Sequence, residues 1–177
     1  MSLTGKSIII ERDVSAILVP SGQVFELKAG TPVRITQALG GNFSVEIFGQ
    51  LAMIGSEDQD ALGLEPDPEA ASHLSNQALS LEEKVVLQIK SCYDPEIPVN
   101  IYDLGLIYGI SIFEDRVNIV MTLTSPTCGM GPFIVEDVKR RVHRIPEVSE
   151  VDIELLFDPP WDKSRLSQVA KLQLNLL

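Results

Sequence analysis

The feature that most constrains the fold of this chain is an acidic stretch that begins near residue 57. Residues 57–80 contain six acidic residues and no lysine or arginine, whereas residues 1–56 carry four residues of each sign. Charged sequence that contains proline offers little apolar surface for a core. We therefore expect two domains, residues 1–56 and 80–177, joined by an acidic, proline-containing linker over residues 57–79 that is disordered or extended.

Residues 1–56 consist of short β-like runs separated by glycine- and proline-containing turns. This spacing predicts a small all-β module, either an antiparallel barrel or a sandwich. The module has no histidine, no cysteine and no clustered carboxylates, so we interpret it as a partner-binding or stabilising module rather than a catalytic one. The expected strands are residues 7–10, 16–19, 24–27, 33–36, 43–48 and 51–54.

Residues 80–177 predict an α/β (α+β) domain in the order helix, strand, strand, helix, strand and short terminal helix. Ser80 and Glu83 have the spacing of a capping box and mark the start of the first helix. The polar turn at residues 114–116 separates two β-branched runs and indicates a hairpin, and residues 151–157 alternate as a half-buried strand does. A helix is also expected from residue 162 to the end of the printed sequence.

The segment at residues 124–132 places a cysteine, Cys128, between a strand-like run and a helix that Pro132 is suited to begin. The positive end of a helix favours an anion, and we expect Gly129 and Gly131 to adopt positive φ and turn N–H groups towards the sulfur. A free thiol has a pKa of about 8.5, and this setting lowers it. Cys128 is therefore interpreted as an activated thiol. The alternative is a small buried apolar side chain that fills the loop.

The second cysteine, Cys92, is expected to belong to the core. It shares one helix face with Leu81, Val85 and Ile89, and it lies at the negative end of that helix, where a thiolate is disfavoured. A disulfide with Cys128 is an open alternative, but two cysteines do not form a disulfide framework. We expect a reduced, cytoplasmic protein.

The loop over residues 94–107 carries three carboxylates, Asp94, Glu96 and Asp103, among two prolines that keep it out of a helix. These groups could serve as acid/base groups or oxygen ligands beside the thiol. Aspartates in such loops more often accept hydrogen bonds from nearby backbone N–H groups, and we favour that role.

Composition excludes two classes of partner. No apolar run approaches the roughly 20 residues that cross a bilayer, so no membrane association is expected. The net charge of −11 opposes contact with a phosphate backbone, so nucleic-acid binding is not expected either.

The loop at 94–107, the segment from Thr122 to Gly131 and the sequence Asp158-Pro159-Pro160-Trp161 together resemble metal-sulfur cluster assembly proteins of the SufT and PaaD type. The resemblance spans residues 80–177, and the β-rich N-terminal module points to the SufT type. It implies that Cys128 is the family's reactive cysteine and that the 94–107 loop and Trp161 lie near it. Many relatives have Cys-Pro at this point; Cys128-Gly129 resembles the SufT branch. The supporting motif residues are Asp94, Glu96, Asp103, Thr124, Thr127, Gly129, Gly131 and Trp161.

The resemblance implies an accessory factor that delivers iron-sulfur clusters to client apoproteins and is not an enzyme. A cluster usually needs about four ligands, so Cys128 would be a transient ligand of a labile cluster, completed by a homodimer partner, a small thiol or a client. Apart from such a cluster no cofactor is expected, and the partners are assembly machinery and clients. Two alternatives stay open: a cysteine-dependent enzyme, for which His143 is too far along its helix to act as the base, and an adaptor that ligates no cluster.

Overall fold

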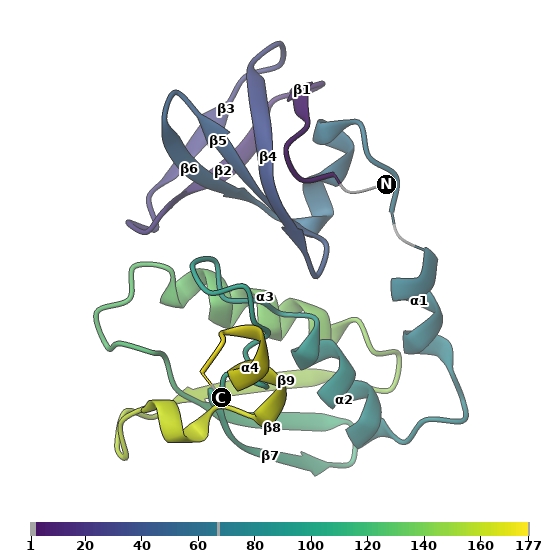
Figure 1. The fold of residues 1–177 in the computed structure, drawn as a ribbon. Helices are drawn as coiled ribbons and strands as arrows, with labels where there is room; N and C mark the ends of the chain where they lie inside the picture. The colour runs from purple at the N-terminus through teal and green to yellow at the C-terminus, as the bar shows by residue number, and fades with distance from the viewer. Residues whose placement is uncertain (1–2, 67, 177) are drawn as a thin grey trace. The chain divides into compact units, whose positions relative to one another are not determined.

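The computed structural model describes residues 3–66 and 68–176. The chain divides into two compact units, Met1–Pro68 and Glu69–Leu177, called here the N-terminal unit and the C-terminal unit. Figure 1 shows a β-rich N-terminal unit and a C-terminal unit that combines helices with a small sheet. The mixed composition agrees with the fold class expected from the sequence.

The N-terminal unit is built on one six-stranded antiparallel sheet that curls on itself (Figure 1). Each of the six β-like runs in the sequence coincides with one of its strands. Because all six strands belong to a single sheet in the order β1-β4-β5-β6-β2-β3, the sandwich alternative does not apply. The strands are β1 Ser7–Ile9, β2 Val14–Val19, β3 Val24–Leu27, β4 Pro32–Leu39, β5 Asn42–Ile47 and β6 Gln50–Ile54.

The core of this unit extends beyond residue 56, which corrects the expected start of the linker. The 3₁₀ helix η1, Ser56–Leu62, buries Ala61 and Leu62 in the N-terminal core. Two acidic side chains of η1 are paired with a basic residue of the same unit. Arg12 forms ion pairs with Asp58 at 2.8 Å and with Asp60 at 2.6 Å. A second part of the expected tether forms helix α1, Pro68–Ser75.

From α2 onwards, the C-terminal unit has the order of elements that the sequence predicts, whereas helix α1 ahead of it was not expected. Strands β7 and β8 form an antiparallel hairpin whose turn includes Glu114 at φ 55°, and β8 pairs in parallel with β9. A parallel pair needs a crossover connection, and α3 supplies it. The elements are α2 Leu81–Lys90, β7 Ile107–Phe113, β8 Arg116–Met121, α3 Gly131–His143, β9 Glu150–Leu155, η2 Lys163–Arg165 and α4 Gln168–Gln173.

Helices α2 and α3 lie over the same face of the three-stranded sheet (Figure 1). Alternate residues of β8, Val117 and Ile119, point into this layer and are almost fully buried. They belong to one core with Val85 of α2 and Val138 of α3. This two-layer arrangement fixes the end of β8 and the start of α3, between which the Cys128 loop runs.

The C-terminal segment is not the continuous helix expected from residue 162, because only η2 and α4 are helical. It packs on the 94–107 loop. The Trp161 indole Nε1 donates to the Leu104 carbonyl at 2.7 Å, and the Arg165 guanidinium lies 3.8 Å from the centre of the Tyr108 ring. Gly105, at φ 75°, allows the Arg165 backbone to lie against the loop, since a Cβ at this position would collide with the Arg165 carbonyl oxygen.

Candidate functional site

Cys128 lies in the loop that joins β8 to α3, just before the helix begins, as the sequence predicts. Its backbone N–H donates to the Ser125 carbonyl at 3.1 Å, and its own carbonyl accepts from the Gly131 N–H at 3.1 Å. The side chain is partly exposed and packs against the edge of the core. The thiol is therefore held by two consecutive turns and still reaches solvent.

The two threonines of the motif differ in their surroundings. The Thr127 hydroxyl lies 3.0 Å from the Ser125 hydroxyl, and the Thr127 N–H donates to the same oxygen at 3.3 Å. Thr127 is exposed, whereas Thr124 is half-buried. These short-range bonds make residues 125–127 a defined turn ahead of the thiol.

The expectation that Gly129 and Gly131 adopt positive φ is wrong. Neither is among the positive-φ glycines in the described part of the chain. Gly129 is exposed, while Gly131 is buried, and a Cβ on Gly131 would lie 2.6 Å from Leu123 Cδ1. Glycine at position 131 is thus required by close packing rather than by backbone conformation.

Helix α3 begins without a side-chain cap. Its N-cap residue is Met130, at φ −87° and ψ −2°, and no side chain of that residue bonds to the first turn. Pro132 lies within the first two helical positions, where its missing N–H costs nothing. The start of α3 therefore depends on packing and on the loop before it.

Cys92 is a core residue, as predicted. It is 1% exposed, and its thiol donates to the Gln88 carbonyl at 3.5 Å. Burial raises the pKa of the Cys92 thiol well above its ordinary value. Both cysteines are free thiols, so the disulfide alternative does not apply.

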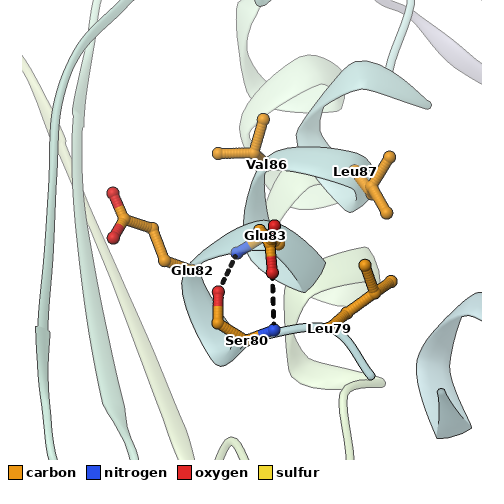
Figure 2. Close-up of a pocket in the computed structure, with 6 residues that line it drawn as sticks. All are labelled: Leu79, Ser80, Glu82, Glu83, Val86 and Leu87. Atoms are coloured by element: carbon orange, nitrogen blue, oxygen red, sulfur yellow. Dashed lines mark hydrogen bonds between the residues drawn. The ribbon is translucent and has the colours of Figure 1, made fainter. Parts of the chain in front are cut away.

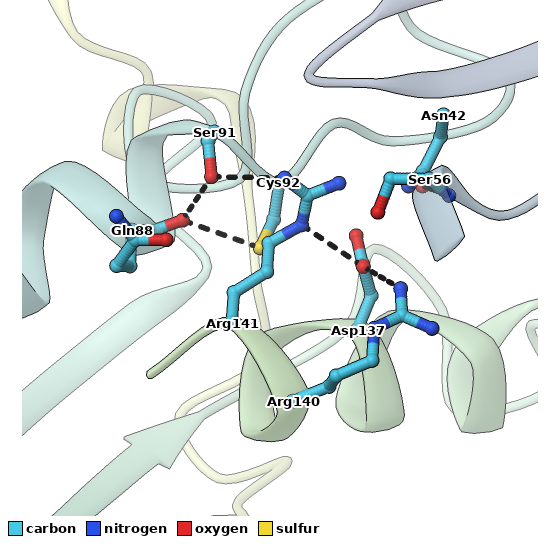
Figure 3. A network of polar contacts seen from close by, with 8 residues as sticks. All are labelled: Asn42, Ser56, Gln88, Ser91, Cys92, Asp137, Arg140 and Arg141. Carbon is cyan, nitrogen blue, oxygen red and sulfur yellow. Dashed lines mark hydrogen bonds and ion pairs between the residues drawn. The ribbon is translucent and has the colours of Figure 1, made fainter. Parts of the chain in front are cut away.

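A polar network next to Cys92 links α2 to α3 (Figure 3). The Ser91 hydroxyl donates to the Gln88 carbonyl at 2.6 Å and accepts from Arg141 Nη1 at 3.2 Å. Arg141 Nε in turn donates to Asp137 Oδ1 at 2.9 Å. Arg141 is 5% exposed, so this basic side chain is buried between α2 and α3 instead of facing solvent. The i,i+4 spacing of Asp137 and Arg141 was the signal that could have revealed the pair.

The carboxylates of the 94–107 loop serve its structure. Asp94 is 4% exposed, and its Oδ1 accepts from the N–H groups of Glu96 at 2.8 Å and Ile97 at 2.9 Å. Burial raises the pKa of the Asp94 carboxyl. Asp103 Oδ2 accepts from Asn100 Nδ2 at 2.6 Å, whereas Glu96 is exposed. The aspartates thus stabilise local turns, which is the role favoured from the sequence.

The 94–107 loop contacts both other parts of the sequence motif. The Leu106 carbonyl accepts from the Thr122 N–H at 2.8 Å, where β8 leads towards Cys128, and the Leu104 carbonyl accepts from Trp161. Among the described residues, no group of three or more histidine, cysteine, aspartate or glutamate side chains is arranged to hold a metal ion. The parts of the motif are thus joined by hydrogen bonds to backbone carbonyls of the 94–107 loop rather than by converging ligands.

A separate groove lies at the start of α2 (Figure 2). The capping box is formed as predicted: the Glu83 N–H donates to the Ser80 hydroxyl at 3.2 Å, and the Ser80 N–H donates to the Glu83 carboxylate at 2.7 Å. This groove has a volume of about 370 Å³ and contains none of the predicted site residues. Its lining residues are Leu79, Ser80, Glu82, Glu83, Val86 and Leu87.

Comparison with known proteins assigns the family. The sequence model described as iron-sulfur cluster assembly protein matches residues 82–154. An Fe-S protein maturation auxiliary factor of Porphyromonas gingivalis is 45% identical over 105 residues, which cover 59% of this chain and 100% of the relative. The chain belongs to the iron-sulfur cluster assembly protein family. None of the helices in residues 3–66 and 68–176 is long and apolar enough to cross a membrane.

Two further family members agree with this assignment. The Fe-S protein maturation auxiliary factor SufT of Staphylococcus aureus is 39% identical over 84 residues, covering 47% of this chain and 96% of the relative. The crystal structure of a domain of unknown function, DUF59, from Bacillus anthracis is 36% identical with a TM-score of 0.52, covering 55% of this chain and 93% of that chain.

The matches to the two maturation factors account for 100% and 96% of the relatives' lengths but only 59% and 47% of this chain. The likeness comes from the cluster assembly domain that contains Cys128.

Proposed function

We propose that this protein is an accessory factor in the maturation of iron-sulfur proteins and that Cys128 is its transient contact with the cluster or its sulfur. The accessory role in maturation rests on the family to which the chain belongs. The role of Cys128 rests on its partly exposed thiol and on the backbone hydrogen bonds to Ser125 and Gly131 that hold this residue before the start of α3. Cys92 cannot take this role while folded, because it is buried.

The number of ligands explains why the role is delivery rather than storage. An iron-sulfur cluster usually has about four protein ligands, mostly cysteine thiolates. Cys128 contributes one, and the described residues contain no cluster of further candidate ligands around it. A site completed by another molecule releases its cargo when that molecule is exchanged, and this suits a carrier rather than an enzyme.

The remaining ligands come from a partner. A client apoprotein, the assembly machinery, a small thiol or a second copy of this chain in a homodimer could each supply thiolates. The proposal includes a reducing, cytoplasmic compartment, because both cysteines are free thiols and Cys128 must remain so to act. No resident cofactor is needed apart from the labile cluster.

Anaerobic reconstitution tests direct ligation. Wild type, Cys128→Ser and Cys92→Ala are incubated with iron and sulfide, and the bound iron and sulfide are measured after desalting. We expect Cys128→Ser to lose most of the bound iron, and Cys92→Ala to retain it because its thiol is buried. Equal contents in wild type and Cys128→Ser would contradict direct ligation and favour the adaptor alternative.

Delivery is tested separately with a client. Reconstituted protein is mixed with an apoprotein that needs a cluster, in the presence of an iron chelator, and recovery of the client's activity is followed. Recovery with wild type and its loss with Cys128→Ser would support transfer through this thiol. Sedimentation of the apo and reconstituted forms shows whether a second copy completes the site.

A further inference from the structure

We propose that the contact between Gly131 and Leu123 positions Cys128, which makes Gly131 a positioning residue for the thiol. The inference rests on the proposed function, since it assigns a device to the same site. Its evidence is the packing at the two ends of the loop between β8 and α3.

The contact between Gly131 and Leu123 joins the two ends of the loop. Leu123 lies near the beginning of the loop and Gly131 at its end, where α3 starts. A Cβ on Gly131 would lie 2.6 Å from Leu123 Cδ1, closer than two carbon atoms can approach. Leu123 is 5% exposed and belongs to the core of the C-terminal unit, so it has little room to rotate away.

Cys128 depends directly on this closure. The Gly131 N–H donates to the Cys128 carbonyl at 3.1 Å, so a displacement of Gly131 carries the cysteine backbone with it. The other end of the loop is fixed, because the Thr122 N–H donates to the Leu106 carbonyl at 2.8 Å. A change at position 131 therefore alters the place of the thiol relative to the start of α3 rather than moving the whole loop.

A conformational explanation for the glycine predicts the opposite effect of substitution. A helix is less stable with glycine than with alanine at an interior position, and Gly131 does not have positive φ. If backbone preference alone mattered, Gly131→Ala would stabilise the helix and leave Cys128 unchanged. The packing against Leu123 predicts a displaced first turn instead.

The test is the alkylation rate of Cys128 in the full chain, measured by peptide mass spectrometry. We expect Gly131→Ala to slow the reaction by at least about threefold, at the low end of coupling between contacting residues. Adding Leu123→Val removes the Cδ1 atom and should restore the rate towards that of Leu123→Val alone. Gly109→Ala is the control, because a Cβ at Gly109 meets nothing within 4 Å.

Labelling of Cys92 reports loss of fold in the same samples. If Gly131→Ala exposes Cys92 and Leu123→Val reverses that exposure, the contact is supported as well. A wild-type rate in Gly131→Ala, or a defect that Leu123→Val does not relieve, overturns the proposal. The reconstitution experiment shows separately whether the proposed function fails. In that case Cys128→Ser would bind as much iron as wild type, while the coupling between Gly131 and Leu123 in the alkylation rate would remain.

Discussion

The surroundings of the two cysteines show how one residue type is given opposite properties within a single small domain. Cys92 follows the C-terminal end of α2, is 1% exposed and lies beside the Ser91, Arg141 and Asp137 network. Cys128 precedes the start of α3 and is partly exposed. The comparison teaches that burial, rather than the thiol itself, decides which cysteine can be reached from solvent.

The two helix starts differ in a related way. Helix α2 begins with a complete capping box formed by Ser80 and Glu83, whereas Met130 gives α3 no side-chain cap. The helix that precedes the buried cysteine is thus stabilised locally. The helix that follows the partly exposed cysteine depends on packing, and the preceding loop can therefore influence its first turn.

The largest expected effect is the contrast in alkylation rate. Cys92 can react only from opened states, and an unfolding free energy of about 5 kcal/mol would slow it by about three to four orders of magnitude relative to an exposed thiol. Peptide-resolved alkylation of the native full chain measures this ratio. In denaturant both thiols should react at similar rates. Native rates within tenfold of each other would contradict the inferred difference in accessibility between Cys92 and Cys128.

The next effect concerns Asp94, two residues beyond Cys92. Asp94→Ala leaves the Glu96 and Ile97 N–H groups without their acceptor and should destabilise the C-terminal unit by about 2 kcal/mol. Asp94→Asn keeps an oxygen acceptor and serves as the matched control. Urea unfolding followed by fluorescence of Trp161, the one tryptophan of the sequence, measures both.

The Asn variant also carries a pH signature. Burial raises the folded-state pKa of the Asp94 carboxyl above its unfolded value of about 3.9. The stability linked to protonation of this carboxyl is therefore fully present below the unfolded pKa and is lost as the pH rises through the folded-state pKa. Asp94→Asn should therefore be more stable than wild type at pH 7, with the difference shrinking towards pH 4. A slower Cys128 alkylation in this variant would instead indicate an acid/base role.

A smaller effect separates serine substitutions at the two cysteines. Cys92→Ser replaces a fully buried thiol with a smaller and more polar hydroxyl and should cost about 1.5 kcal/mol. Cys128→Ser, at a partly exposed position, should cost less than about 0.5 kcal/mol. Trp161 fluorescence in urea compares them, and equal losses would show that the Cys128 side chain is as much a part of the core as Cys92.

The smallest effect tests the helix starts. Ser80→Ala removes the capping hydroxyl and should cost about 1 kcal/mol without changing Cys128 alkylation. Glu82→Gln is the control, since Glu82 lies in the same turn outside the capping box and contributes only about 0.3 kcal/mol through the helix dipole. An altered Cys128 rate in Ser80→Ala would show that the two regions are coupled through α2.

Local patterns predicted the elements but not the contacts between distant residues. Short β-like runs between turn residues identified the six strands of the N-terminal unit, and the capping box marked the start of α2. The charge pattern suggested a tether at residue 57, yet Asp58 and Asp60 pair with Arg12, nearly fifty residues earlier. Local patterns likewise did not reveal that Arg141 is buried, because its partner Ser91 lies at the end of another helix, α2.

The sequence by itself determined the family, the order of elements in the C-terminal unit and the place of Cys128 before a helix, because these depend on periodicity and on motifs of neighbouring residues. Only the tertiary structure decided why Gly131 is glycine, since the limiting atom belongs to Leu123 across the loop. It likewise decided that Asp94 supports a turn and that Trp161 joins the C-terminal segment to Leu104. Close packing and long-range hydrogen bonds depend on residues brought together by folding, and linear spacing does not specify them.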